Sequence, residues 1–175
     1  SLAAAFQAGA DSVYFGIGTL NMRSKSANEF TIDDLKEIAS LCAERGVKSY
    51  LTVNTVIYDE DLPLMRQIVD AAKEAKISAV IASDAAVMMY CRQQGVEVHL
   101  STQLNISNVE ALKFYSQFAD VVVLARELNL RQVKRIDDEI QQQRITGPRG
   151  DLIRIEMFCH GALCMAVSGK CYLKI

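Results

Sequence analysis

The stretch VEVHLSTQLNISNVEALKFYSQFADVVVLA, residues 96–125, has the pattern of a strand, a helix and a second strand. Residues 96–101 and 121–125 are short apolar runs rich in β-branched side chains, which predict strands. Between them, the sequence SNVE at residues 107–110 is a capping-box pattern and predicts a helix that ends near Phe118. Because a strand, a helix and a following strand form a right-handed crossover, this stretch predicts two parallel strands.

The same alternation extends in both directions along the chain. Strands that are each joined by a helix favour an α/β protein with parallel strands, either doubly wound or barrel-like. A parallel barrel of this kind has eight strands, whereas this chain begins inside a predicted helix and stops just after a strand. We therefore expect an incomplete TIM-like (β/α) barrel that forms one domain over residues 1–175, with the N-terminal strand and the C-terminal part of the barrel missing. The other predicted strands are residues 13–17, 47–54, 80–82 and 152–158, and the other predicted helices are residues 1–9, 31–46, 61–76, 84–95 and 130–143.

The composition is that of a globular domain. Half of the 175 residues are hydrophobic, which is enough to bury a substantial core, and no linker-like segment interrupts the chain. The absence of an apolar run near about 18 residues and of a signal-peptide pattern predicts a cytoplasmic protein that does not enter the membrane, with thiols in preference to disulfides. The net charge of -2 gives no global basic surface for nucleic acid.

Polar residues follow several of the predicted strands. In barrels of parallel strands, catalytic groups lie where the strands end and the next loops begin. The two-residue period of a strand places His99, Ser101 and Gln103 on one face, and Arg154, Glu156, Phe158 and His160 on one face. We expect the polar faces to line the barrel and its arginines to bind an anionic substrate. The predicted substrate-binding residues are Asn54, Ser101, Gln103, Arg126 and Arg154.

Two simpler interpretations stand beside this prediction. Buried charges are nearly always paired, so Arg126 or Arg154 could form a buried ion pair with Glu156. His99 in the middle of a strand is expected to be a hydrogen-bonded core residue.

Three of the five cysteines lie in EMFCHGALCMAVSGKC, residues 156–171. Thiols and an imidazole this close together suit a metal or iron-sulfur site, a thiol nucleophile or a redox pair. The spacing between Cys164 and Cys171 is a weak signal by itself, because buried apolar cysteines are common. Cys42 and Cys91 lie on predicted helices and are interpreted as packing residues. Cys159 lies on the opposite strand face from His160 and is expected to be buried against a helix.

The string E-x-F-x-x-G-A-L-C-x4-G-x-C within residues 156–171 resembles the signature of family thirty-two of the unassigned peptidases, the collagenase-like family. The resemblance extends back through LAREL at 124–128, HLSTQ at 99–103, VNT at 53–55 and GADSVYFG at 9–16, so it covers essentially the whole chain. It implies an enzyme. The family contains enzymes labelled as peptidases, and others that hydroxylate a pyrimidine of ribosomal or transfer RNA, or the ubiquinone ring.

The resemblance also implies a cofactor. In the hydroxylating relatives, the cysteines that match Cys164 and Cys171 are ligands of a four-iron four-sulfur cluster, and two further ligands come from downstream sequence. The RNA-modifying relatives are thought to take the hydroxyl group from prephenate, a small dicarboxylate that Arg126 and Arg154 would suit. With only two of four ligands present, the 175-residue fragment is expected to lack the cluster and to have a mobile segment after Gly161.

Three functions remain open. Hydrolysis of peptides would use Cys164 as a nucleophile with His160 four residues before it. A non-catalytic zinc or interaction module would use Cys159, His160, Cys164 and Cys171. We favour iron-sulfur-dependent hydroxylation, because hydrolysis leaves Cys171 without a role; its catalytic residues would be His160 and Glu156, four apart in an extended segment and therefore facing one cavity. Its partners would be RNA, bound through domains outside this chain, and a second copy of the chain, paired through open strand edges.

Overall fold

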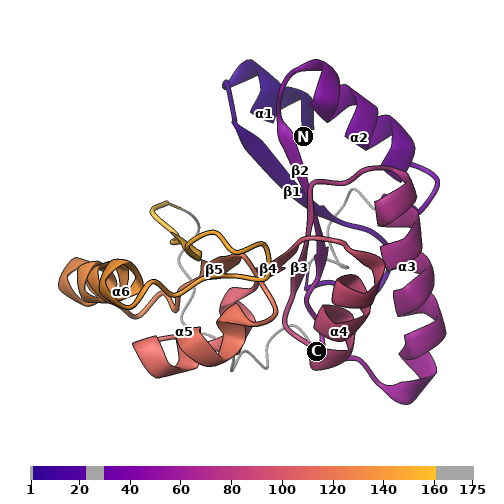
Figure 1. Ribbon diagram of the computed structural model, residues 1–175. Helices are drawn as coiled ribbons and strands as arrows, with labels where there is room; N and C mark the ends of the chain where they lie inside the picture. The colour runs from indigo at the N-terminus through magenta and orange to yellow at the C-terminus, as the bar shows by residue number, and fades with distance from the viewer. Residues whose placement is uncertain (1, 23–29, 161–175) are drawn as a thin grey trace. The chain divides into compact units, whose positions relative to one another are not determined.

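The structure is a computed structural model that describes residues 2–22 and 30–160 (Figure 1). The chain divides into two compact units, Ser1–Glu97 and Val98–Ile175. The expectation of one domain over the whole chain stays a prediction.

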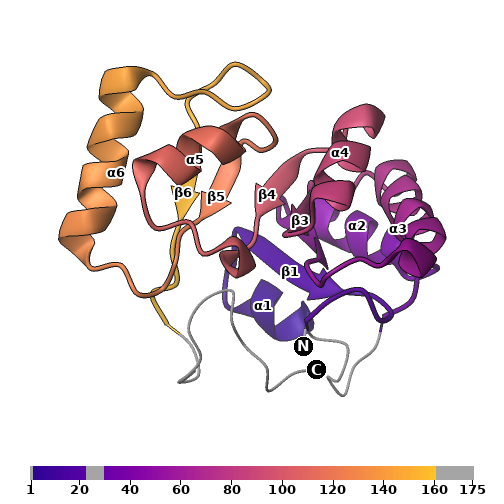
Figure 2. The ribbon, with the colours of Figure 1, turned by 90° about the horizontal axis from the view of Figure 1, so that it is seen from below.

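Unit 1 contains three parallel strands that neighbour one another in chain order. Figures 1 and 2 show the three longer helices α2, α3 and α4 side by side along these strands. The backbone N–H of Val80 donates to the carbonyl oxygen of Glu97 at 2.9 Å, so the chain leaving α4 runs beside β3. The elements are α1 Leu2–Gln7, β1 Ser12–Gly16, α2 Leu35–Glu44, β2 Lys48–Val53, η1 Asp59–Asp61, α3 Leu62–Glu74, β3 Ala79–Ala82 and α4 Ala85–Gln94.

The helices of unit 1 bury one face each, as their sequence period predicts. In α3 the buried residues Met65, Ile68, Val69 and Ala72 recur at intervals of three and four, which is the spacing of one side of a helix. The strands β2 and β3 are buried over most of their length. Parallel strands covered by helices have this near-continuous apolar character.

The ends of α4 follow ordinary capping chemistry. The side chain of Asp84 accepts a hydrogen bond from the backbone N–H of Ala86 at 2.8 Å and caps the first turn. Gly95 ends the helix with φ of 70°, a left-handed conformation that glycine adopts without steric cost. The helix predicted over residues 84–95 has these two residues at its ends.

Asp34 stabilises the turn before α2, and its contribution is expected to depend on pH. Its carboxylate accepts hydrogen bonds from the backbone N–H of Thr31 at 2.7 Å and from the Thr31 hydroxyl at 2.9 Å. These bonds hold the pKa of Asp34 below its usual value of 3.8. A lowered carboxyl pKa contributes stability above 3.8 that is lost as the pH falls through this value toward the folded-state pKa. Chemical denaturation of the wild type and Asp34→Asn from neutral to acidic pH should therefore show a smaller acid loss of stability in the variant; parallel curves would contradict this assignment.

Unit 2 also contains parallel strands in chain order, since β4 pairs with β5 and β5 with β6. The register places His99 opposite Val121, and Val123 opposite Glu156. The helices α5 and α6 contact each other, and α5 contacts β5 (Figure 2). The elements are β4 Val98–Leu100, η2 Thr102–Leu104, α5 Val109–Ser116, β5 Val121–Val123, α6 Leu130–Gln143 and β6 Arg154–Glu156.

A buried carboxylate connects β5 to the loop before β6. Asp120, which is 7% exposed, accepts a hydrogen bond from the backbone N–H of Arg149 at 3.1 Å. Its carbonyl oxygen accepts from the backbone N–H of Arg154 at 2.9 Å. Gly147 lies so close to this residue that a Cβ there would be 2.5 Å from the Asp120 carboxylate. The loop is therefore built around Asp120.

Parallel strands alternating with helices confirm the α/β class and the expected incomplete TIM-like barrel. The last strand is shorter than the predicted residues 152–158, because only residues 154–156 pair with β5. Among the described strands, β1 and β6 each pair on one side only, so association of two copies through these edges stays a prediction.

Candidate functional site

The carboxyl ends of β5 and β6 bring two predicted site residues to the same end of unit 2. The backbone N–H of Leu124 donates to the carbonyl oxygen of Glu156 at 2.9 Å. The backbone N–H of Ala125 donates to the carbonyl oxygen of Ile106, also at 2.9 Å. Arg126 follows directly, and both Arg126 and Glu156 are exposed. This is the end at which parallel barrels hold their catalytic groups.

Arg154 lies at the other end of β6, next to Asp120 and opposite Val121. Arg126, Arg154 and Glu156 are all exposed in the structure. The interpretation that Glu156 forms a buried ion pair with Arg126 or Arg154 is therefore wrong, because all three side chains are exposed to water. Their predicted roles in binding and catalysis stay predictions.

Ser101 and Gln103 belong to a turn and not to one face of a strand. The strand β4 ends at Leu100, and residues Thr102–Leu104 form a single 3-10 turn. The hydroxyl of Ser101, which is 4% exposed, accepts from the backbone N–H of Gln103 at 3.3 Å and caps this turn. The two-residue period therefore does not reach Gln103, although it does include His99, which is buried as predicted.

His160 and Cys159 lie beyond the end of β6, and both are exposed. The expectation that Cys159 is buried against a helix is wrong. The strand stops at Glu156, so its alternation of faces does not determine where Cys159 points. For the same reason, the shared face of Glu156 and His160 stays a prediction. Cys164, Cys171 and the segment after Gly161 lie outside the described residues.

In unit 1, Asn54 follows β2 and holds the loop that follows β1. Its side-chain oxygen accepts from the backbone N–H of Met22 at 3.1 Å. Asn21, which is 2% exposed, donates to the carbonyl oxygens of Ile17 and Gly18 at 3.0 Å each. Asn54 therefore positions this loop, and contact with a substrate stays a prediction.

Asn21 is a residue that sequence reasoning missed. It fits against Gly16, where any Cβ would overlap the Asn21 side chain. The available signal was a glycine at the end of a strand, since glycine there often permits close approach of another group.

Asp84 and Thr55 lie at the same end of unit 1. One carboxylate oxygen of Asp84 accepts a hydrogen bond from the backbone N–H of Ala86 in α4, and the other accepts from the backbone N–H of Ile57 at 3.1 Å. Both oxygens therefore bind backbone groups of the protein itself. The hydroxyl oxygen of Thr55 is buried and has no hydrogen-bond partner within residues 2–22 and 30–160. It is a polar atom that a bound molecule could satisfy.

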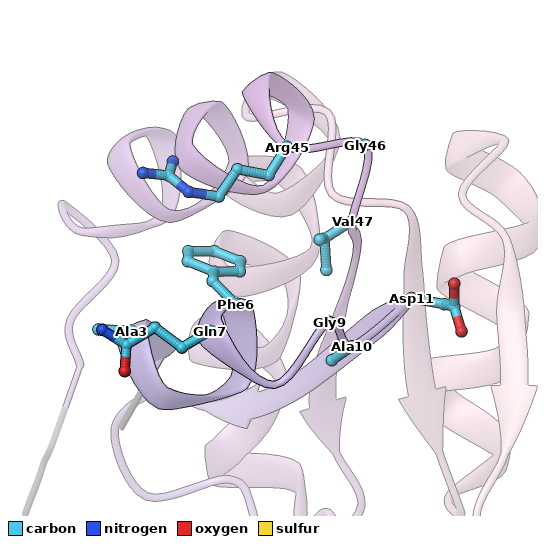
Figure 3. A pocket seen from close by; sticks show the side chains of 9 residues that line it. All are labelled: Ala3, Phe6, Gln7, Gly9, Ala10, Asp11, Arg45, Gly46 and Val47. Carbon is cyan, nitrogen blue, oxygen red and sulfur yellow. The ribbon is translucent and has the colours of Figure 1, made fainter.

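A cavity of about 590 Å³ lies at the opposite end of unit 1, beside the amino ends of β1 and β2 (Figure 3). The guanidinium carbon of Arg45 lies 4.8 Å from the centre of the Phe6 ring, and Figure 3 shows these side chains forming one wall. Catalytic groups in parallel barrels lie at the other end of the strands, so this cavity is separate from the predicted site.

Two of the thiols are unsuited to chemistry. Cys42 in α2 and Cys91 in α4 are 1% and 0% exposed. Burial raises the pKa of the Cys42 thiol, and it raises the pKa of the Cys91 thiol to about 12. Both were predicted to be packing residues, and both are.

This burial predicts a pattern of alkylation. At mildly alkaline pH, Cys91 should hold about a thousandfold less thiolate than a thiol with the ordinary pKa of 9.0, and only the thiolate reacts. Iodoacetamide should therefore modify Cys159 in the native protein, and Cys42 and Cys91 only after unfolding. Peptide mass spectrometry measures each site. Rapid native labelling of Cys91 at the rate of Cys159 would contradict the burial argument.

Within residues 2–22 and 30–160, no three His, Cys, Asp or Glu side chains are arranged to hold a metal ion. Over the same part of the chain, none of the helices is long and apolar enough to cross a membrane.

The chain is similar to proteins named as peptidases and to proteins named for RNA hydroxylation. A family model described as peptidase family U32 matches residues 1–174. A protein named collagenase from Porphyromonas gingivalis is 69% identical over 175 residues, which are 100% of this chain and 42% of that protein. tRNA hydroxylation protein P1 of Bacillus subtilis is 33% identical over 94% of this chain and 37% of its own length. The 23S rRNA 5-hydroxycytidine C2501 synthase of Escherichia coli is 32% identical over 94% of this chain and 23% of its own length.

A solved structure of a U32 peptidase has a TM-score of 0.60 at 14% identity, covering 73% of this chain and 56% of that one. This similarity shows a shared fold. The chain spans less than half the length of these curated relatives.

Proposed function

Because this chain belongs to peptidase family U32, we propose that the complete protein is an iron-sulfur-dependent enzyme that hydroxylates a pyrimidine base of RNA in the cytoplasm. Relatives named for tRNA and rRNA hydroxylation align over 94% of the chain. These names are the reason to place the substrate in RNA.

The distribution of thiols carries the proposal. Cys42 and Cys91 are buried and have raised pKa values, so sulfur chemistry is left to Cys159, Cys164 and Cys171. A hydrolytic nucleophile would need one thiolate, whereas ligation of a cluster gives Cys164 and Cys171 a common role.

The described residues do not hold such a cluster by themselves, since no group of three ligating side chains is present in that part of the chain. Its ligands would be Cys164 and Cys171 together with residues from the rest of the complete protein. When bound, a cluster supplies electron transfer or a Lewis-acidic iron.

The described side chains would bind the small substrate and move protons. Arg126, just beyond the carboxyl end of β5, would bind a carboxylate of a dicarboxylate such as prephenate, because guanidinium groups bind carboxylates through paired hydrogen bonds. Arg154 lies at the amino end of β6, so it would have to reach the same molecule from the other end of that strand. Glu156 and His160 would transfer protons, which carboxylates and imidazoles do in many enzymes. Ser101 and Gln103 in unit 2, and Asn54 in unit 1, would each contribute polar groups that bind substrate.

A peptidase is the second candidate, favoured by one observation: the relative that is 69% identical is named collagenase. In that reaction Cys164 would attack the peptide carbonyl, with His160 as its base. A zinc or interaction module remains the third, and its donors would be Cys159, His160, Cys164 and Cys171.

Purification of the complete protein without oxygen separates the three candidates. The proposal predicts iron and acid-labile sulfide, and a hydroxylated pyrimidine nucleoside in RNA from cells that contain the gene but not from cells lacking it. Mass spectrometry of digested RNA measures this nucleoside. A metal-free protein that degrades gelatin would establish the peptidase, and a protein containing zinc alone would establish the module.

A further inference from the structure

The outward face of α6 has a cationic surface, formed by Arg131, Lys134 and Arg135. All three side chains are exposed, and Arg131 lies one turn before the neighbouring residues Lys134 and Arg135 in the first half of the helix. The opposite side of α6 is apolar and contributes the buried residues Ile136 and Ile140.

The charges of α6 are arranged against the preference of a helix. The amino end of a helix is stabilised by acidic side chains and the carboxyl end by basic ones. In α6 the first turn contains no acidic residue and the last turn no basic residue. The acids Asp137, Asp138 and Glu139 come after the cations along the helix. This order is unfavourable for the helix dipole, and within α6 Lys134 forms an ion pair with Asp138, four residues later.

The cap of α6 is neutral as well. Asn129 and Gln132 form a reciprocal capping box, with hydrogen bonds of 2.9 and 3.0 Å between side chains and backbone N–H groups. The usual acidic member of this motif is replaced by an amide. The backbone N–H groups of Asn129 and Gln132 therefore have acceptors within the protein. The positive charge at the start of α6 comes from the side chains of Arg131, Lys134 and Arg135.

Two of the three cations have no acidic partner in the described part of the chain. Lys134 donates to both oxygens of Asp138 at 2.7 Å, which raises the pKa of this lysine. Neither Arg131 nor Arg135 forms an ion pair within residues 2–22 and 30–160. Two like charges four residues apart repel each other, unless an anion lies between them.

The cationic surface begins at the end of unit 2 that holds the candidate site. The loop from β5 to α6 starts next to Glu156, contains Arg126 and ends at the Asn129 cap. A bound polyanion that extends from this site along the start of α6 would pass Arg131 and then Arg135.

We propose that the cationic surface of α6 binds the phosphate backbone of the RNA whose base is modified, with Arg131 and Arg135 as the contacting residues. The inference rests on the proposed function for the identity of the polyanion. Arginine suits this role because its planar guanidinium group binds phosphate through two hydrogen bonds. A net charge of -2 for the chain means that attraction to RNA must be local, and this surface provides it.

The test measures binding of the complete protein to an unmodified transfer RNA transcript over a range of salt concentrations. The double variant Arg131→Gln and Arg135→Gln should weaken binding by about tenfold and lower the salt slope by roughly 1.4 to 1.8, because each lost phosphate contact changes the slope by about 0.7 on single strands and about 0.9 on duplex. Arg131→Lys with Arg135→Lys should restore most of the slope. Thermal unfolding should be no easier in the glutamine variant, since repulsion at the helix start is removed.

Lys36→Gln is the matched control, since Lys36 is also an exposed cation in the first turn of a helix, α2 of unit 1. Its RNA affinity and salt slope should equal those of the wild type. Unchanged binding in the Arg131 and Arg135 variant would overturn the inference, as would an equal loss in Lys36→Gln. Loss of binding to anionic lipid vesicles with unchanged RNA binding would also overturn it.

The same experiment separates this inference from the proposed function. If RNA is hydroxylated but its binding ignores Arg131 and Arg135, the proposed function stands and the inference fails. If RNA binding depends on both arginines but no base is hydroxylated, the inference stands and the proposed function fails. With both correct, the variant should raise KM for RNA and leave kcat near that of the wild type.

Discussion

Replacing Cys164 or Cys171 by serine in the complete protein is expected to abolish bound iron and RNA hydroxylation together. Each proposed ligand supplies one of the few thiolates that hold a cluster, and a hydroxyl group is a poor substitute for a thiolate on iron. Anaerobic iron analysis and nucleoside mass spectrometry should both fall to background. Far-ultraviolet circular dichroism should remain that of the wild type, which separates loss of the cluster from loss of the fold.

Cys159→Ser is the matched control within the same sixteen-residue cluster, and it should retain iron and activity. Cys159 is exposed just beyond β6, and it lies outside the proposed pair. If Cys159→Ser removes the iron while Cys171→Ser retains it, the ligands have been assigned to the wrong cysteines. If the protein contains no iron and only Cys164→Ser, not Cys171→Ser, abolishes its enzymatic activity, Cys164 acts as a thiol nucleophile. That result would support the peptidase candidate and contradict the cluster.

Gly147→Ala is expected to destabilise the fold by about 3 kcal/mol, the upper end of the usual cost of overpacking. The added methyl carbon would lie 2.5 Å from the Asp120 carboxylate and 2.9 Å from both the carbonyl oxygen of Ala119 and the Cα of Asp120. Two of these three atoms belong to the backbone just before β5, so a side-chain rotation cannot relieve the overlap. Urea denaturation of the chain measures the loss.

Gly150→Ala, in the same loop, is the control for a different effect. Gly150 has φ of 88°, and no described atom lies within 4 Å of the position that an added methyl carbon would occupy. Its cost should be limited to backbone strain, roughly 1–2 kcal/mol. Equal destabilisation by the two substitutions would show that steric contact with Asp120 is not the reason for glycine at position 147.

The helices were predictable because their signals are local. The bounds of α6 agree with the prediction at both ends, since the amphipathic period and the break after residue 143 lie in the sequence itself. Asp84 and Gly95 define α4 through hydrogen bonds and φ values set by neighbouring residues. The helix α5 begins after Asn108, and its cap was predicted within one residue.

The strand ends were harder to predict, and with them the site. Strand pairing depends on a neighbour that is distant in sequence, and the pattern of residues 152–158 does not reveal that only three of them pair. Extending the two-residue period past the end of β6 gave the wrong burial for Cys159. Extending it past the end of β4 placed Gln103 on a strand face, although Gln103 lies in a turn. Burial of Arg154 and Glu156 was wrong for a related reason, because charge pattern alone does not show whether a strand is covered.

The apolar core described above contains Cys42 and Cys91 as its only cysteines within residues 2–22 and 30–160. Oxidation by air would therefore modify the exposed Cys159 thiol before the buried thiols of Cys42 and Cys91. If the proposed cluster is present, a protein purified in air would keep its melting temperature and chromatographic behaviour after losing that cluster. Structural quality control would pass such a sample, so an inactive result with aerobic protein would describe the handling and not the enzyme.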